Sequence, residues 1–285
     1  MQQYAEEAVE EHLSNLQPEF NRRQKDNPTA PFLDITPAET QKIMNQAMKN
    51  SERWRIMSIN GKSDAEIKQS FEVPAKMKIF TWKGERDTIM KPKDSIIYYK
   101  HFLQTGMMAM EPQTGHVKAW VGGINYKYFQ YDHVGQGARQ VGSTFKPFVY
   151  ATAIDRLQKS PCDMIMDSPF TILKGDNNDK DWTPNNSDGK YRGLVSMKKA
   201  LANSINTVSA RLIHEVGAPA VVEMAKNLGV TSNIPNRPAI ALGAVEITVQ
   251  DMVAAFSTFA NKGIYIKPQL ITRIEDKNGN VFFTD

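Results

Sequence analysis

The chain of 285 residues is poor in cysteine, has no long apolar run and carries no strong excess of either charge. Cys162 is its single cysteine, so a disulfide within the chain is excluded and the redox compartment stays undetermined. No segment approaches the roughly 18 consecutive apolar residues of a membrane span. The N-terminal stretch MQQYAEEAVEEHLSNLQ has four glutamates and no apolar core, so it is not a signal peptide. Either a cytosolic protein or a piece of a longer protein, with its targeting segment elsewhere, fits these absences.

Signatures of metal and nucleic-acid sites are also missing. The five histidines form no HxxxH or HExxH pair, so we expect no zinc site. The most basic window, residues 76–94, interleaves lysines with Phe80 and Trp82. A solvated strand edge explains this window more simply than a nucleic-acid site, because no wider basic face accompanies it. We therefore expect no nucleic-acid partner.

The first part of the chain has a charged, helical pattern. Apolar residues at helical spacing near the N-terminus stop at Pro18, which predicts the end of a first helix there. Thr36 and Ser63 each open a capping box, and the first box predicts a helix to about Arg55. We interpret residues 1–75 as a helical linker region without chemistry of its own.

After Pro74 the pattern changes to strands, then helices, then strands again. The stretch MKIFTW predicts a strand, GMMAMEPQTGHVKAWVGG predicts two strands joined by a turn, and LITRIEDKNGNVFF predicts a hairpin around Asn278-Gly279. A helix that holds Lys146 is followed by the long polar loop KGDNNDKDWTPNNSDGKYRG, and then by helical patterns at about residues 196–203, 206–216, 219–228 and 248–261. This order predicts an α+β domain with an antiparallel sheet over residues 76–285.

Three Ser-x-x-Lys spacings occur, and one has a distinctive setting. They are Ser143/Lys146, Ser187/Lys190 and Ser196/Lys199. Ser187 falls in a glycine-rich loop, and Ser196 is placed to cap a helix. Ser143 follows a glycine and precedes a helix that is apolar on nearly all faces, so Lys146 should enter the core.

Burial would favour the neutral amine of Lys146, which could then act as a base toward Ser143, three residues earlier on the same helical face. The helix N-terminus would favour an oxyanion near Ser143. From the residues alone, a nucleophile with its base and a simple helix cap both remain open. A second element, Ser204-Ile205-Asn206, places a hydroxyl and an amide at the entrance of another helix. It too is open to interpretation as a helix start.

Three long stretches together resemble one family. GARQVGSTFKPFVY, LANSINTVSARL and IALGAVEITVQDMVAAFSTFANKGIY are similar to the transpeptidase domain of class A penicillin-binding proteins, which are bifunctional peptidoglycan synthases. WTPNNSDGKYRG resembles the Tyr-x-Pro-x-Asn loop of that family, with Trp182 in place of tyrosine. The resemblance implies the penicillin-binding protein and serine β-lactamase fold, an antiparallel sheet with a helical subdomain. Residues 1–75 resemble only the connection from the glycosyltransferase domain.

The resemblance also implies a role for each site residue. Ser143 would be the acylated nucleophile, Lys146 its general base and Ser204 a proton relay. Asn206 would bind the amide of the peptide or β-lactam, and Trp182 and Asn186 would complete the substrate site. No metal or organic cofactor is implied.

The implied substrate is the D-Ala-D-Ala end of a peptidoglycan stem peptide, supplied through a lipid-linked precursor and cross-linked to a neighbouring amine. β-Lactam antibiotics would acylate the same serine. The implied location is the bacterial cell envelope, at the outer face of the cytoplasmic membrane. A membrane anchor outside this chain and other cell-wall synthesis proteins would be its partners.

One departure from the family leaves alternatives open. The third motif, Lys-Thr-Gly or Lys-Ser-Gly, is absent, so we expect an internal fragment that lacks its C-terminal strands and is impaired as an enzyme. A serine β-lactamase-like hydrolase is one alternative, although no Glu-x-x-x-Asn segment between Ser143 and Ser204 supplies a carboxylate for water activation. A non-catalytic fragment or pseudoenzyme that binds cell-wall synthesis proteins is the other.

Overall fold

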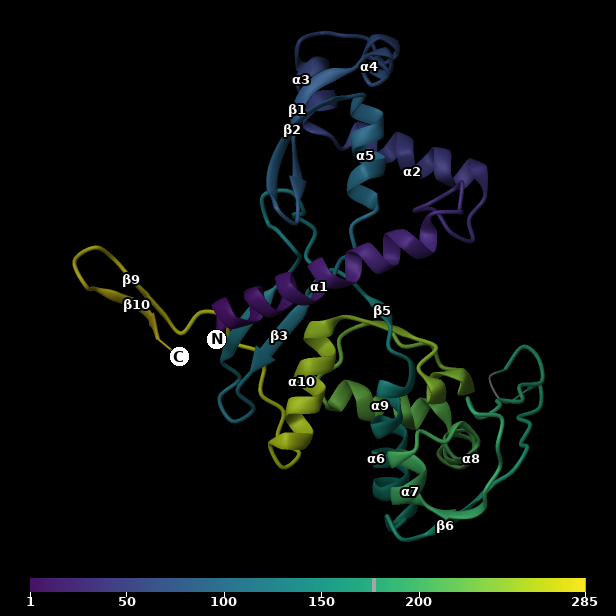
Figure 1. Cartoon of the computed structure of the whole chain (residues 1–285). Helices are drawn as coiled ribbons and strands as arrows, with labels where there is room; N and C mark the ends of the chain where they lie inside the picture. The colour runs from purple at the N-terminus through teal and green to yellow at the C-terminus, as the bar shows by residue number, and fades with distance from the viewer. Residues whose placement is uncertain (176–177, 285) are drawn as a thin grey trace. The chain divides into compact units, whose positions relative to one another are not determined.

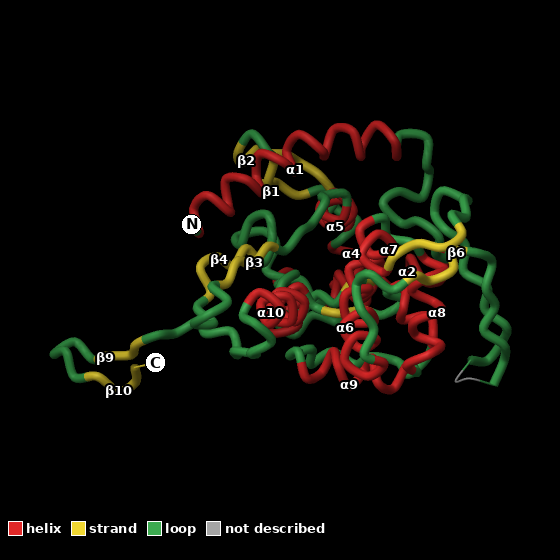
Figure 2. Tube along the Cα trace, turned by 90° about the horizontal axis from the view of Figure 1, so that it is seen from below, coloured by secondary structure: helices red, strands yellow, loops and turns green. Residues whose placement is uncertain are grey.

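The computed structural model describes residues 1–175 and 178–284, which are drawn in Figures 1 and 2. The chain divides into two compact units. One consists of Gln3–Thr105 and Ile124–Phe129 and is called the N-terminal unit below. The other consists of Met1–Gln2, Gly106–Gly123 and Gln130–Asp285 and is called the C-terminal unit.

The N-terminal unit combines helices with one antiparallel hairpin. Its elements are α1 (Gln2–Gln24), α2 (Pro37–Lys49), α3 (Glu52–Ile59), α4 (Asp64–Ser70), β1 (Ala75–Thr81), β2 (Gly84–Met90) and α5 (Pro92–Lys100). In both capping boxes the Thr36 or Ser63 hydroxyl accepts from the backbone amide of the glutamate three residues later. The side chain of that glutamate accepts in turn from the backbone amide of the threonine or serine, so both predicted boxes are confirmed. The boundary predicted after residue 75 lies inside this unit, between α4 and β1. That this boundary separates two domains stays a prediction.

Two helix ends in this unit differ from the sequence prediction. Helix α1 continues through Pro18, although proline removes one backbone hydrogen bond. The preceding residue, Gln17, is buried, and its side chain donates to the His101 carbonyl at 2.8 Å and accepts from the Leu103 amide at 2.9 Å. These tertiary bonds hold the turn that contains the proline. Helix α2 ends at Lys49, before Arg55, because the Ser51 side chain caps the new helix α3.

The C-terminal unit contains the remaining elements. They are β3 (Met107–Met110), β4 (Val117–Val121), β5 (Arg139–Gln140), the 3₁₀ helix η1 (Gly142–Phe145), α6 (Lys146–Leu157), β6 (Met164–Asp167), β7 (Gly193–Ser196), α7 (Met197–Ala202), α8 (Asn206–Val216), α9 (Ala218–Asn227), the 3₁₀ helix η2 (Pro238–Leu242), β8 (Glu246–Ile247), α10 (Val249–Ala260), β9 (Arg273–Glu275) and β10 (Val281–Thr284). The strands pair in antiparallel couples: β3 with β4, β5 with β8, β6 with β7, and β9 with β10. Helices and antiparallel strands together confirm the predicted α+β class.

Helix α6 lies at the centre of the main hydrophobic core. It packs against α8 and α9, and the three helices lie together in Figure 2. Phe145, Phe148, Val149 and Ala153 are fully buried. This burial follows from the apolar sequence of the helix, and it carries the lysine at the start of α6 out of solvent.

Candidate active site

Ser143 lies on a short turn that leads directly into the core helix. Its residue is exposed within η1, and the residue before it, Gly142, has a left-handed φ of +56°. The N-cap residues of η1 and α6 are Val141 and Phe145, and neither makes a side-chain capping bond. The helix-cap interpretation of Ser143 is therefore wrong, and its hydroxyl stands at the surface.

A second glycine fixes the backbone of this turn. The Gly142 amide donates to the Gly243 carbonyl at 3.1 Å, and the Val141 amide donates to the Val245 carbonyl at 3.1 Å. Gly243 follows η2, has a φ of +71°, and approaches so closely that a Cβ placed on it would lie 1.8 Å from the Gly142 oxygen. Only glycine fits both the conformation and the contact.

Lys146 is buried beneath this turn and is satisfied by residues far away in the sequence. Only 1% of the residue is exposed. Its Nζ donates to the Ser204 carbonyl at 2.7 Å, to the Ser204 Oγ at 3.0 Å and to the Asn206 Oδ1 at 2.6 Å. These three acceptors match the three N–H groups of an ammonium.

Burial lowers the pKa of Lys146 from 10.5 to about 8. A larger fraction of the amine is therefore neutral near pH 7 than for an exposed lysine. Within residues 1–175 and 178–284 no hydrogen bond joins its Nζ to the Ser143 Oγ. The amine is instead oriented toward the Ser204–Asn206 segment.

The Ser204–Asn206 segment owes its shape to an unusual backbone and to a borrowed cap. Ser204 has a left-handed φ of +53°, and both its carbonyl and its hydroxyl contact the Lys146 amine. Helix α8 begins at Asn206, and its N-cap residue Ile205 has no side chain able to cap it. Asn186 supplies the cap, since its Oδ1 accepts from the amides of Asn206 (2.9 Å) and Thr207 (3.2 Å).

The two remaining predicted site residues, Asn186 and Trp182, both contact other parts of the protein. Asn186 is buried, and its Nδ2 donates to Asp167 Oδ1 at 2.7 Å and to the Lys190 carbonyl at 2.8 Å. Its amide is thus engaged at both ends within the protein. Trp182 packs against the hydrophobic core and exchanges two 2.9 Å backbone bonds with Ile172. Their predicted contacts with substrate stay predictions.

Asp167 and Thr207 are part of this site but escaped the sequence analysis. Asp167 is 1% exposed and accepts from the Thr207 hydroxyl at 2.6 Å and from the Arg192 amide at 2.9 Å. Burial by itself raises the pKa of Asp167, but hydrogen bonds from Thr207, Asn186 and Arg192 bring it below its ordinary value. The available signal was an aspartate that ends a short strand, and that signal is weak on its own.

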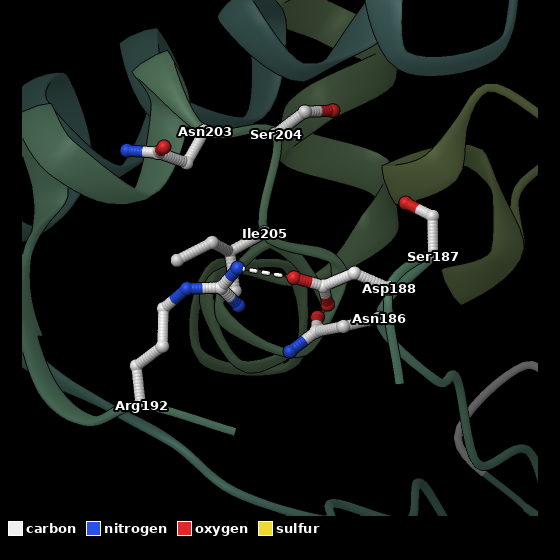
Figure 3. A pocket seen from close by; sticks show the side chains of 7 residues that line it. All are labelled: Asn186, Ser187, Asp188, Arg192, Asn203, Ser204 and Ile205. Carbon is white, nitrogen blue, oxygen red and sulfur yellow. Dashed lines mark hydrogen bonds and ion pairs between the residues drawn. The ribbon is translucent and has the colours of Figure 1, made fainter. Parts of the chain in front are cut away.

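A pocket of about 250 Å³ borders Ser204 on this side of the unit (Figure 3). The Arg192 guanidinium bonds to Asp188 across it. The residues that line the pocket are Asn186, Ser187, Asp188, Arg192, Asn203, Ser204 and Ile205.

The other two Ser-x-x-Lys pairs lack the burial of the first. Ser187 lies in the pocket wall, and its partner Lys190 is exposed. Ser196 caps α7 by accepting from the Lys199 amide at 3.3 Å, which confirms the predicted cap. Of the three lysines, Lys146 alone is buried.

Residues 1–175 and 178–284 contain no group of three His, Cys, Asp or Glu side chains placed to bind an ion. Over these ranges, no helix has the length and apolar character needed to cross a bilayer.

Comparison with known proteins assigns this chain to a family. The model of the penicillin-binding protein transpeptidase domain matches residues 105–284, and that of the penicillin-binding protein middle domain matches residues 27–103. The chain belongs to the penicillin-binding protein transpeptidase family. This membership confirms the predicted resemblance and fold class.

Relatives of this transpeptidase domain include two penicillin-binding proteins 1A. That of Aquifex aeolicus is 37% identical over 181 residues, which is 63% of this chain and 24% of the relative. That of Neisseria flavescens is 34% identical over 200 residues, or 70% of this chain and 24% of the relative. The chain thus spans about a quarter of the length of these curated relatives.

Solved structures of similar penicillin-binding proteins share the fold. Penicillin-binding protein 1A from Haemophilus influenzae aligns with a TM-score of 0.59 and 30% identity, over 64% of this chain and 27% of that one. PonA1 from Mycobacterium tuberculosis aligns with a TM-score of 0.55 and 26% identity, over 64% of this chain and 50% of that one.

Proposed function

We propose that the chain is part of a longer parent protein, a peptidoglycan D,D-transpeptidase that works through a serine acyl-enzyme and is acylated by β-lactams. The observation that carries the proposal is the buried Lys146 amine, bonded to Ser204 and Asn206, three residues after the exposed Ser143. Family membership supports the same assignment.

In the proposed reaction, the Ser143 Oγ attacks the carbonyl carbon between the two terminal D-alanines. Its proton passes to the neutral Lys146 amine, either directly or through the Ser204 hydroxyl, which lies 3.0 Å from that amine. The C–N bond then breaks, the departing D-alanine amine takes a proton, and the acyl group stays on Ser143. An amine of a neighbouring stem peptide next attacks the ester, gives up a proton and restores the serine.

The position of Asn206 suits it to binding the amide of the substrate. Its Oδ1 is held by Lys146 at 2.6 Å and its Nδ2 donates to the Asn185 carbonyl at 2.8 Å. The side chain is therefore fixed beside the Lys146 amine, and the second N–H of its Nδ2 can donate to the carbonyl of the substrate amide. For a β-lactam, the same serine attack opens the ring and leaves the ring nitrogen to be protonated.

We further propose the context of the parent protein. Residues 1–75 would connect a glycosyltransferase domain to the transpeptidase, and a membrane anchor would hold the protein at the outer face of the cytoplasmic membrane. The lipid-linked precursor and other cell-wall synthesis proteins would be its partners. Membership of the penicillin-binding protein transpeptidase family supports each of these proposals about the whole protein.

Labelled penicillin tests the proposal directly. The parent protein is incubated with the antibiotic, and intact mass followed by peptide mapping locates the adduct. We expect one adduct, on Ser143. An adduct on Ser187 or Ser196 would refute the assignment, and no adduct would favour the non-catalytic alternative. Rapid release of hydrolysed antibiotic would favour the β-lactamase-like alternative.

A further inference from the structure

The hydrogen bonds behind Asn206 form a continuous chain that begins at a buried carboxylate. We infer that Asp167, Asn186 and Thr207 are positioning residues, which hold the first turn of α8 so that Asn206 and Ser204 meet the Lys146 amine. The inference rests on the proposed function. It assigns to Asn186 a role distinct from the substrate contact that the family resemblance implies.

The first link is the cap of α8. The first amides of a helix have no partner within it, and a side-chain oxygen usually satisfies them. Ile205 cannot do so, and Asn186, twenty residues before Asn206, accepts from the amides of both Asn206 and Thr207. Without the Asn186 oxygen, the backbone amides of Asn206 and Thr207, which lie next to the Lys146 amine, would lose their hydrogen-bond acceptor.

The second link sets the orientation of the Asn186 amide. An ionised carboxylate only accepts hydrogen bonds, so Asp167 must face the NH₂ end of Asn186, as the 2.7 Å contact shows. The Lys190 carbonyl faces the same end at 2.8 Å. The oxygen of Asn186 is therefore directed at the start of α8, and the opposite orientation would oppose like groups at both ends.

The third link ties Asp167 to the helix itself. The Thr207 hydroxyl, in the first turn of α8, donates to Asp167 at 2.6 Å within a fully buried environment. A negative charge beside a helix N-terminus is favourable, and here it anchors the turn that carries Asn206. Asp167 thus holds α8 twice, once through Thr207 and once through Asn186.

Thr207 offers the sharpest test, because valine replaces its hydroxyl with a methyl of the same shape. The acylation rate constant and the pre-acylation dissociation constant of the parent protein are measured with a fluorescent penicillin. We expect Thr207→Val to lower the rate constant about tenfold, the order of effect of one buried hydrogen bond, and Thr207→Ser to restore it to within about threefold.

Thr258 supplies a matched control, since it is also a buried threonine of the C-terminal unit and donates to the Ala254 and Leu228 carbonyls. Thr258→Val should also lower the melting temperature, by less than Thr207→Val because only neutral carbonyls lose a donor, and it should leave acylation unchanged. Asn186→Ala should act in the same direction as Thr207→Val, with a larger loss.

The outcomes separate this inference from the proposed function. If wild-type parent protein is not acylated, the proposed function is wrong and this inference falls with it. If wild type is acylated normally and Thr207→Val matches it, only the inference is wrong. If Thr207→Val and Thr258→Val lose acylation rate equally, or if Thr207→Ser does not recover it, these hydrogen bonds have only a general structural role.

Discussion

The close approach of Gly243 to Gly142 predicts a large effect from a single methyl group. Gly243→Ala would place a Cβ 1.8 Å from the Gly142 oxygen and 2.4 Å from its carbonyl carbon. A normal carbon–oxygen contact needs about 3.3 Å, so one backbone must retreat by roughly 1.5 Å. The left-handed φ costs alanine about 1–2 kcal/mol, and forcing atoms into a packed site costs about 1–3 kcal/mol. We expect the free energy of unfolding to fall by about 2–5 kcal/mol.

Ser143 directly follows Gly142, so a retreat of the Gly142 backbone would move the Ser143 hydroxyl and lower the acylation rate as well as the stability. A misplacement of about 1 Å can lower a rate about 100-fold, and we expect a loss of that order in acylation by fluorescent penicillin. Gly263→Ala is the control, because Gly263 also has a positive φ but its added Cβ would meet no atom within 4 Å. It should cost only the conformational strain. Equal melting temperatures and equal acylation in the two variants would show that this contact does not position Ser143.

Two further predictions concern Lys146. Lys146→Arg should abolish acylation of the parent protein although the positive charge is kept, since arginine is not deprotonated in proteins; near-normal rates would leave Lys146 only an electrostatic role. Because burial lowers the pKa of Lys146 to about 8, the acylation rate of wild type should rise with pH and level off above about pH 8. A rate that is flat from about pH 6 to 9, or that still rises steeply at pH 10, would contradict a base with that pKa.

The sequence was sufficient to single out Ser143 and Lys146, because their spacing and the apolar helix behind them are local features. The hairpin turns and the two capping boxes were predictable for the same reason: each depends on residues a few positions apart. Family resemblance then linked this pair to Ser204 and Asn206, which the structure brings to the Lys146 amine. Spacing alone could not have joined them.

What escaped prediction depends on tertiary contacts. Pro18 ordinarily ends a helix, and the buried hydrogen bonds of Gln17 to His101 and Leu103, which the sequence does not reveal, support the continuation of α1. Likewise, nothing near Asp167 in the sequence indicates that it will meet Thr207, forty residues later. The hydrogen bonds of Asn186 to Asp167 and to the start of α8 were also not predictable from its loop motif, because they join residues 19 to 21 positions apart.

The partners of the Lys146 amine also have a consequence for how the chain folds. They lie 58 and 60 residues away, so the amine cannot find them until a long loop has closed. Until then its charge would have to stay hydrated, and α6 could not complete its burial. Contacts between residues far apart in the sequence form late and slow folding. Recovery of penicillin acylation during refolding should therefore lag behind recovery of helical circular dichroism, and the antibiotic would serve as a reporter of the last step.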